Sequence, residues 1–257
     1  MRYVRFLTDN QSFWGMLDHN DMIQPMTAAP YLGGSPSGQP VALGTVRLLA
    51  PCEPSKIVAV GKNYHDHIKE FDSVVPETPI LFIKPSTCVN DPDSPIILPP
   101  PELSQQIDYE GELALVISRK ACRISAAEAG QYILGYTCLN DVTARDIQKK
   151  DNQWTRAKGF DGFAPIGPWL TDEVDPTDLQ IQTRLNGKIM QESSTSQQIW
   201  PVNELVAFIS QSMTLLPGDV ITTGTPAGVG KMAAGDRVEI SIEGIGTLRN
   251  TAQTETR

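Results

Sequence analysis

Two glutamates separated by a single residue lie in a segment that the sequence pattern indicates is buried. Glu110 and Glu112 belong to residues 107–117, IDYEGELALVI, which we interpret as one β-strand. Side chains at positions i and i+2 of a strand point the same way, so both acids face one side. The second half of the segment is apolar on both faces, which is typical of a buried strand. Residues 104–118 contain no Lys or Arg, so the compensating charge must come from elsewhere.

A divalent cation is the simplest partner for these two acids, because burying unpaired carboxylates is costly. Asp141 ends a second apolar run, residues 132–139, and could join them as a third ligand. An all-oxygen ligand set suits Mg²⁺, and also Mn²⁺ or Ca²⁺, better than zinc. The chain has three histidines, which makes a His-rich zinc site hard to build. The alternative interpretation of the alternating acids is a solvated edge strand.

A histidine and a glutamate lie about one helical turn apart in residues 62–71, which we predict to form a short helix. His67 and Glu70, at positions i and i+3, share one face of that helix. A carboxylate that fixes the imidazole tautomer would make His67 an oriented general base. Two alternatives stay open, namely a solvated surface pair and His65 as the working imidazole.

Two glycine-containing loops are further candidates for the site. Residues 224–230, GTPAGVG, follow a predicted strand but match neither the dinucleotide-binding pattern nor the Walker A pattern. The backbone amides of this loop and the Thr225 hydroxyl could hold a small carboxylate, although a tight turn would need the same glycines. Lys158 begins the segment KGFDG, where it could pair with an anion or simply be exposed.

The elements that must position these residues are mostly short strands separated by turn-forming residues. Asn186–Gly187, for example, predicts a two-residue hairpin. Many short strands with few helices predict a β-rich α+β protein. The turn-rich residues 30–40 indicate a linker, so we predict a small N-terminal β domain with its linker at residues 1–50 and a catalytic domain at residues 51–257.

Composition argues against several classes of function. The net charge of −9 argues against nucleic acid as a partner. No run approaches the ~20 apolar residues of a membrane span, and the first residues do not resemble a secretory signal, so we expect no membrane association. The four cysteines form no C-x-x-C pair, which favours reduced thiols and a cytoplasmic location.

Taken together, the motifs resemble those of the fumarylacetoacetate hydrolase family. The matching stretches occur in order over about residues 51–250. They are GKNY at 61–64 with His67 and Glu70, DYEGELA at 108–114, GYT at 135–137, NDVTARD at 140–146, KGFD at 158–161 and TGTPAGVG at 223–230. The resemblance implies a mixed β-sandwich roll, usually a homodimer, preceded by a small N-terminal domain.

The resemblance also implies roles for individual residues. It makes Glu110, Glu112 and Asp141 the Mg²⁺ ligands. It makes His67 and Glu70 the dyad on a lid helix that occurs in members that cleave C–C bonds. The positions that match substrate contacts are Gln148, Lys158 and Thr225.

The implied activity is that of a Mg²⁺-dependent enzyme acting on a small 2-oxo acid. The expected reaction is C–C bond cleavage, as in acylpyruvate hydrolysis or oxaloacetate decarboxylation, with Lys158 stabilising the enolate and His67 activating water or moving a proton. An isomerase or tautomerase of a 2-hydroxydiene-dioate or of oxaloacetate is the main alternative, because these reactions share an enolate. A metal- or carboxylate-binding module without catalysis is the non-enzyme alternative.

Overall fold

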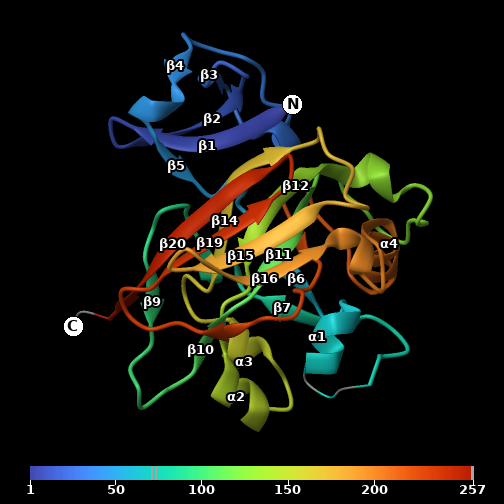
Figure 1. Ribbon diagram of the computed structural model, residues 1–257. Coiled ribbons are helices and arrows are strands. Elements are labelled where there is room, and N and C mark those ends of the chain that lie inside the picture. The colour runs from blue at the N-terminus through green and yellow to red at the C-terminus, as the bar shows by residue number, and fades with distance from the viewer. Residues whose placement is uncertain (71, 73, 256–257) are drawn as a thin grey trace.

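The computed structural model describes residues 1–70, 72 and 74–255 (Figure 1). The predicted end of the lid helix at residue 71 and residues 256–257 of the predicted catalytic domain therefore lie outside the described residues. Strands dominate the described chain, and the helices lie around the sheets (Figure 1). The prediction of a β-rich α+β protein is confirmed.

The largest sheet runs through the whole molecule and mixes antiparallel with parallel pairs, such as the parallel pair β17–β6. Its strands, in spatial order, are β4 (Val41–Ala42), β3 (Met22–Met26), β2 (Gln11–Leu17), β1 (Arg2–Thr8), β14 (Ala164–Thr171), β12 (Ile133–Asn140), β11 (Gly111–Ile117), β17 (Val220–Thr222), β6 (Ile57–Gly61) and β7 (Ile80–Lys84). Two further strands attach to it, β5 (Arg47–Leu49) on β1 and β8 (Val89–Asn90) on β14.

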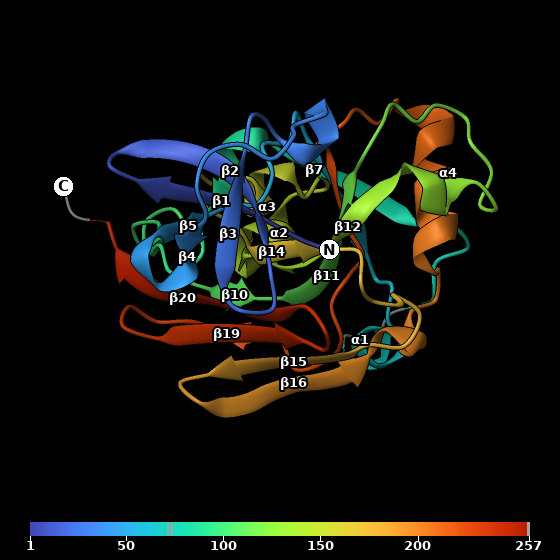
Figure 2. The same cartoon turned by 90° about the horizontal axis from the view of Figure 1, so that it is seen from above.

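A second sheet packs against the middle of the first and closes the core. Its strands, in spatial order, are β16 (Lys188–Ser194), β15 (Gln180–Leu185), β19 (Arg237–Ile242), β20 (Gly246–Thr254) and β9 (Ile96–Leu98). Figure 2 shows β15, β16 and β19 as a layer beside β11 and β14. Leu113 and Leu115 of β11 share one buried hydrophobic cluster with Ile181 of β15 and Ile240 of β19. This arrangement is the β-sandwich that the resemblance implies.

The N-terminal strands form a β unit with a small core of their own, made by Val4, Phe6, Leu17 and Ile23. This unit joins the large sheet through β1 and β14, where Tyr3 lies opposite Leu170. The predicted domain boundary after residue 50 falls just beyond β5 and stays a prediction.

The helices are short, and those near the candidate site lie at one end of the sandwich (Figure 1). The α-helices of the described chain are α1 (His65–Glu70), α2 (Arg145–Lys150), α3 (Thr155–Lys158) and α4 (Val202–Ser212). The 3₁₀ turns are Pro30–Leu32, Leu43–Thr45, Ser86–Cys88, Ala129–Tyr132 and Thr195–Gln197. No helix in the part of the chain that the structure describes is long and apolar enough to cross a membrane.

The prediction of one continuous strand over residues 107–117 was wrong, because the chain changes sheets at Glu110. Residues before it form β10 (Ile107–Tyr109), which pairs with β13 (Thr143–Ala144) and β18 (Gly230–Lys231) in a small third sheet. Residues after it form β11 of the large sheet. The Glu110 N–H donates to Asn140 Oδ1 (3.0 Å), and the Glu110 carbonyl accepts from the Asp141 N–H (2.9 Å). These bonds place the first acid at the junction between the two sheets.

Candidate metal centre and active site

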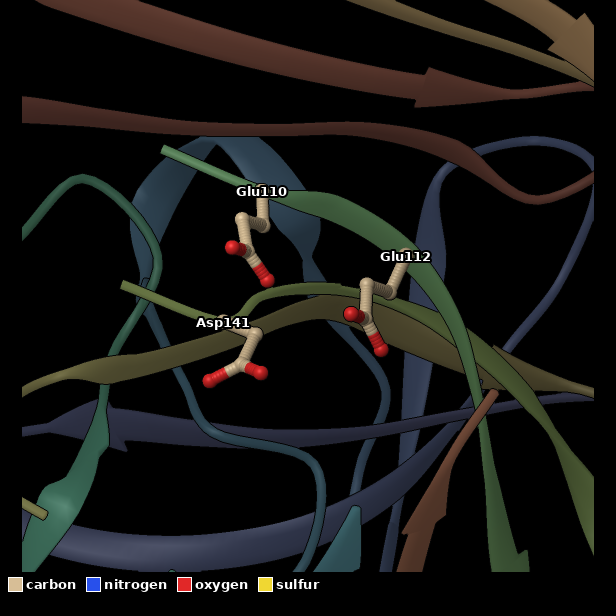
Figure 3. A group of neighbouring side chains, drawn as sticks. All are labelled: Glu110, Glu112 and Asp141. Atoms are coloured by element: carbon tan, nitrogen blue, oxygen red, sulfur yellow. The ribbon is translucent and has the colours of Figure 1, made fainter. Parts of the chain in front are cut away.

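Two neighbouring acidic side chains and a third from about 30 residues further along the chain meet at the junction of β10, β11 and β12. Figure 3 shows Glu110 and Glu112 on one segment and Asp141 just after β12, with their carboxylates side by side. One oxygen of each acid lies within 4.8 Å of the others, and the residues are at most 4% exposed. The pairing of β11 with β12 explains this proximity, because Gly111 lies opposite Asn140 and Glu112 opposite Leu139.

The glycine between the two glutamates is required by the packing of the second sheet. A Cβ atom at Gly111 would lie 2.1 Å from Thr183 Oγ1 of β15. The Gly111 N–H also donates to the amide oxygen of Gln191 in β16 (2.9 Å). The motif Glu-Gly-Glu therefore turns two acids to one side while the backbone between them presses against the other sheet.

Buried cations already surround the acids. Lys158 Nζ lies 2.8 Å from Glu110 Oε2 and 2.6 Å from Asp141 Oδ2. Arg145 pairs with the other oxygen of Glu110, and Lys84 Nζ lies 2.6 Å from Asp141 Oδ1. From the sequence we expected a metal ion to compensate the charge of the acids. Lysine and arginine side chains of distant segments supply part of that compensation.

Glu112 differs from its neighbours, because no salt bridge among the described residues reaches it. Its Oε2 instead accepts hydrogen bonds from the Thr222 hydroxyl and from the Gly224 N–H (2.9 Å). Burial raises the pKa of Glu112 well above its ordinary value, and repulsion from Asp141 and Glu110 adds to the shift. Of the two glutamates, Glu112 is therefore the one that holds a proton more tightly.

Glu110 shows the opposite shift. Its burial disfavours the charged form, but attraction from Lys158 and Arg145 outweighs burial and holds the pKa of Glu110 well below its ordinary value. The two glutamates are two residues apart and equally buried, yet their surroundings drive their pKa values in opposite directions.

The donor set fits a divalent cation such as Mg²⁺. All three side chains offer carboxylate oxygens, which hard cations prefer. Octahedral ligands at about 2.1 Å from Mg²⁺ lie about 3 to 4 Å apart, so the 4.8 Å cluster needs only a small contraction. The Lys158 ammonium between Glu110 and Asp141 shows that the cluster attracts positive charge at this point. Among the described residues, this group of acids is the candidate for holding the ion.

We expect the affinity of this site for Mg²⁺ to depend on pH through Glu112. Below the raised pKa of Glu112 each bound ion must displace a proton, so the apparent affinity should fall about tenfold per pH unit. Above that pKa the affinity should level off. Titration calorimetry in two buffers of different ionisation enthalpy would measure the affinity and the release of about one proton per ion. Equal affinity at every pH, with no proton released, would contradict the expectation.

His67 lines the same cavity and is paired with Glu70 of the same helix. His67 Nδ1 is 3.1 Å from Glu70 Oε2, and their side chains are 11% and 30% exposed. A carboxylate at Nδ1 favours the tautomer that carries its proton there, which leaves Nε2 as the basic nitrogen. His67 lines the cavity together with the three acids, whereas His65 is exposed and is not among the lining residues. His67 is therefore the better-placed imidazole of the two.

The predicted substrate-contacting residues line this cavity as well. Its volume is about 210 Å³, which suits a small acid rather than a nucleotide cofactor. Gln148 lies on α2 and accepts a hydrogen bond from Arg145 Nη1 (2.6 Å). Lys158 ends α3, and Thr225 comes from the glycine-rich loop. The structure therefore brings Gln148, Lys158 and Thr225 into one space with the acids and His67.

The Thr225 hydroxyl is already engaged on two sides. It donates to the Gly111 carbonyl (2.8 Å) and accepts from Gln191 Nε2 (2.8 Å). Its hydrogen is therefore committed to the backbone between the two glutamates. A ligand at Thr225 would meet the remaining lone pair, so the side chain suits a hydrogen-bond donor of the ligand better than a carboxylate.

Sequence reasoning missed four residues of this site. Arg145 stands in the quoted motif NDVTARD, and its position beside an acidic motif was a usable signal. Lys84 ends the apolar strand ILFIK and is fully buried, so it needed an acidic partner. Trp154 lines the cavity and packs edge-on against Phe82, with ring centroids 5.4 Å apart. Gln191 lies in a hairpin strand that gives no local signal.

Comparison with families of known proteins accounts for nearly the whole chain. The family model described as fumarylacetoacetate (FAA) hydrolase C-terminal matches residues 56–253. A second model, described as Rv2993c-like, N-terminal, matches residues 1–51.

Individual relatives are similar over most of the chain. An uncharacterised protein of Archaeoglobus fulgidus is 58% identical, over 84% of this chain and 85% of that protein. Oxaloacetate tautomerase YisK of Bacillus subtilis is 42% identical, over 80% of this chain and 74% of that protein. The crystal structure of a 5-carboxymethyl-2-hydroxymuconate delta-isomerase from Mycobacterium smegmatis superimposes with a TM-score of 0.92 at 44% identity and covers 99% of this chain and 100% of its own.

Proposed function

This chain belongs to the fumarylacetoacetate hydrolase family, and from that premise we propose that it is a divalent-metal-dependent enzyme that forms the enolate of a small 2-oxo dicarboxylic acid. Its proposed reaction is keto–enol tautomerisation, with oxaloacetate as the first substrate to test. The proposal takes the reaction class from relatives that are named oxaloacetate tautomerase and hydroxymuconate isomerase. Mg²⁺ is the proposed ion, with Mn²⁺ and Ca²⁺ as substitutes of similar ligand preference.

The observation that carries the proposal is the meeting of three kinds of group in one cavity. The three acids can hold an ion, His67 with Glu70 can move a proton, and several cations can receive a dianion. The cationic side chains that line the cavity are Lys62, Arg145, Lys149 and Lys158. A dicarboxylate matches this surplus of positive charge once an ion compensates the acids.

Each residue has a defined task in the proposed reaction. An ion held by Glu110, Glu112 and Asp141 would supply Lewis acidity and a fixed orientation for the 2-oxo acid. Lys158 stabilises the negative charge that develops on the keto oxygen as the enolate forms. His67 Nε2 takes a proton from the carbon next to the keto group, and the proton is returned to oxygen. Substrate and product have the same atoms, so the reaction needs no further reactant.

C–C bond cleavage is the second candidate, and the His67–Glu70 pair favours it. An imidazole oriented by a carboxylate can activate water against an acylpyruvate. Decarboxylation of oxaloacetate would pass through an enolate at the same cations. Tautomerisation needs only proton transfer at this site, whereas acylpyruvate hydrolysis also needs an ordered water molecule.

One pair of assays separates these reactions. With oxaloacetate and Mg²⁺, we expect the enzyme to accelerate the decay of the enol absorbance while pyruvate forms no faster than with Mg²⁺ alone. With acetylpyruvate or fumarylpyruvate, NMR would reveal acetate or fumarate together with pyruvate if cleavage were the function. A 2-hydroxydiene-dioate extends the test to isomerisation of longer substrates.

The same assays also test the non-enzyme alternative. If the protein binds Mg²⁺ but turns over none of these acids with Mg²⁺ or Mn²⁺, the tautomerase proposal is wrong and a metal- or carboxylate-binding module becomes the better account. The predicted homodimer and the cytoplasmic location stay predictions.

A further inference from the structure

Gly228 in the glycine-rich loop contacts both the lid helix and the strand that leads into the metal centre. Its N–H donates to Glu70 Oε1 (3.0 Å), and its carbonyl accepts from the Tyr109 hydroxyl (3.0 Å). The φ angle of Gly228 is +100°, and a Cβ atom there would lie 2.0 Å from the Met190 carbonyl oxygen. Gly228 is therefore held in one place by packing and by two hydrogen bonds.

Both oxygens of Glu70 are engaged as a result. Oε1 accepts from the Gly228 N–H, and Oε2 lies 3.1 Å from His67 Nδ1. The carboxylate thus links the imidazole of the lid helix to the backbone of a loop on the sandwich. Because α1 has six residues and Ile68 is its buried side chain, this link adds a restraint on the orientation of the helix to that of the buried residues before it.

Tyr109 occupies the other end of this chain of contacts. It is fully buried in β10, directly before Glu110, and lies opposite Gly230 in the pairing of β10 with β18. Its hydroxyl is the group through which the metal-bearing segment fixes the carbonyl of Gly228. A phenylalanine would fill the same space, so the hydroxyl has a separate role from the ring.

We infer that Tyr109 is a positioning residue for the His67–Glu70 pair and acts through Gly228. The inference rests on the proposed function, because it concerns the dyad that moves the proton. Tyr109 holds Gly228, Gly228 holds one oxygen of Glu70, and the other oxygen orients the imidazole. The geometry of the dyad is thereby set from the strand that directly precedes the first acid of the candidate metal centre.

Tyr109→Phe tests this chain of contacts. We expect kcat for the tautomerase reaction to fall about tenfold, as is typical when a supporting hydrogen bond is lost, with KM and Mg²⁺ affinity unchanged. Amide hydrogen exchange in residues 65–70 should become faster, because the lid helix loses an anchor. Tyr136→Phe, in the buried β12, is the matched control and should change neither kcat nor the exchange rate of residues 65–70.

A double-mutant cycle distinguishes positioning from a general loss of packing. In a Glu70→Ala background, Tyr109→Phe should add little to the loss of kcat and to the exchange rate, because the link is already cut. Additive effects, or an unchanged kcat and unchanged exchange in Tyr109→Phe, would overturn the inference. If Tyr109→Phe does not fold, Glu70→Ala alone tests the Gly228 contact. Faster amide exchange of residues 65–70 in Glu70→Ala supports the contact as a restraint on α1, and unchanged exchange refutes the inference. The exchange measurement needs no substrate, so it stands even if the proposed activity fails.

Discussion

Glu112→Gln is expected to abolish most metal binding while leaving the metal-free fold intact. The substitution removes the negative charge of one candidate ligand. The affinity for Mg²⁺ should therefore fall by more than roughly 100-fold, which is the largest loss usual when a residue that only supports a ligand is changed. Turnover should fall with it. The metal-free fold should tolerate the change, because the raised pKa of Glu112 means that the carboxyl tends to hold a proton. A glutamine amide is a near neutral isostere that can still accept from Thr222 and Gly224.

Glu110→Gln provides the contrast that makes this prediction specific. Glu110 pairs with Lys158 and Arg145, and its pKa is held low, so it is charged in the folded protein. Removing that charge leaves two buried cations without one partner, which typically costs about 3–5 kcal/mol. Thermal unfolding without metal should therefore separate the two variants, with Glu110→Gln the less stable.

Titration calorimetry with Mg²⁺ and thermal unfolding without it are the two measurements. Glu128→Gln is the control, because the Glu128 carboxylate accepts hydrogen bonds from nearby Ser125 and Glu128 is not among the described residues that line the cavity. Wild-type metal affinity in Glu112→Gln would remove Glu112 from the ligand set. Equal destabilisation of Glu112→Gln and Glu110→Gln would show that the two acids do not differ in charge as their surroundings imply.

Local patterns in the sequence pointed to the chemical groups of the candidate site, and the ordered motifs of the family resemblance gave these groups their expected roles. The two glutamates were recognisable from their spacing in an apolar segment, and Asp141 from its place after another. His67 and Glu70 were recognisable from their i, i+3 spacing, and α1 carries both. These signals are local because side-chain direction repeats every two residues in a strand and about every 3.6 in a helix.

Long-range packing was beyond the reach of those patterns. Lys84 contacts Asp141 across 57 residues, and Lys158 contacts Glu110 across 48. Gln191 reaches Gly111 only because the hairpin of the second sheet lies over the β10–β11 junction. The break at Glu110 has the same origin, because hydrogen bonds to residues 140 and 141 pull its backbone out of the ladder. Periodicity within one segment carries no information on which other segment will lie beside it.

The charges of the candidate site explain why it contains buried cations and could also accept an ion. Asp108, Glu110, Glu112 and Asp141 are all buried, and three cationic side chains face them. The acids exceed the cations by one, and Glu112 is the one without an ion pair among the described residues. A proton on Glu112 balances this excess, whereas a bound divalent ion would exceed it by one positive charge, which an anionic substrate could offset. The cluster can therefore exchange the proton for an ion without unfolding.

His67→Ala is expected to lower turnover by roughly 10²- to 10⁴-fold, the usual contribution of a positioned acid or base, while Mg²⁺ affinity stays unchanged. The separation follows from geometry, because His67 lines the cavity from α1 whereas the three candidate ligands lie on the sandwich. Glu70→Gln should give a smaller loss, since the imidazole remains but its orientation is less well fixed. His65→Ala, two residues away on the exposed side of α1, is the matched control and should keep wild-type turnover. Steady-state kinetics on oxaloacetate and calorimetry with Mg²⁺ measure the two effects. Unchanged turnover in His67→Ala would exclude the imidazole as the proton carrier, and lost Mg²⁺ affinity would instead make it part of the metal site.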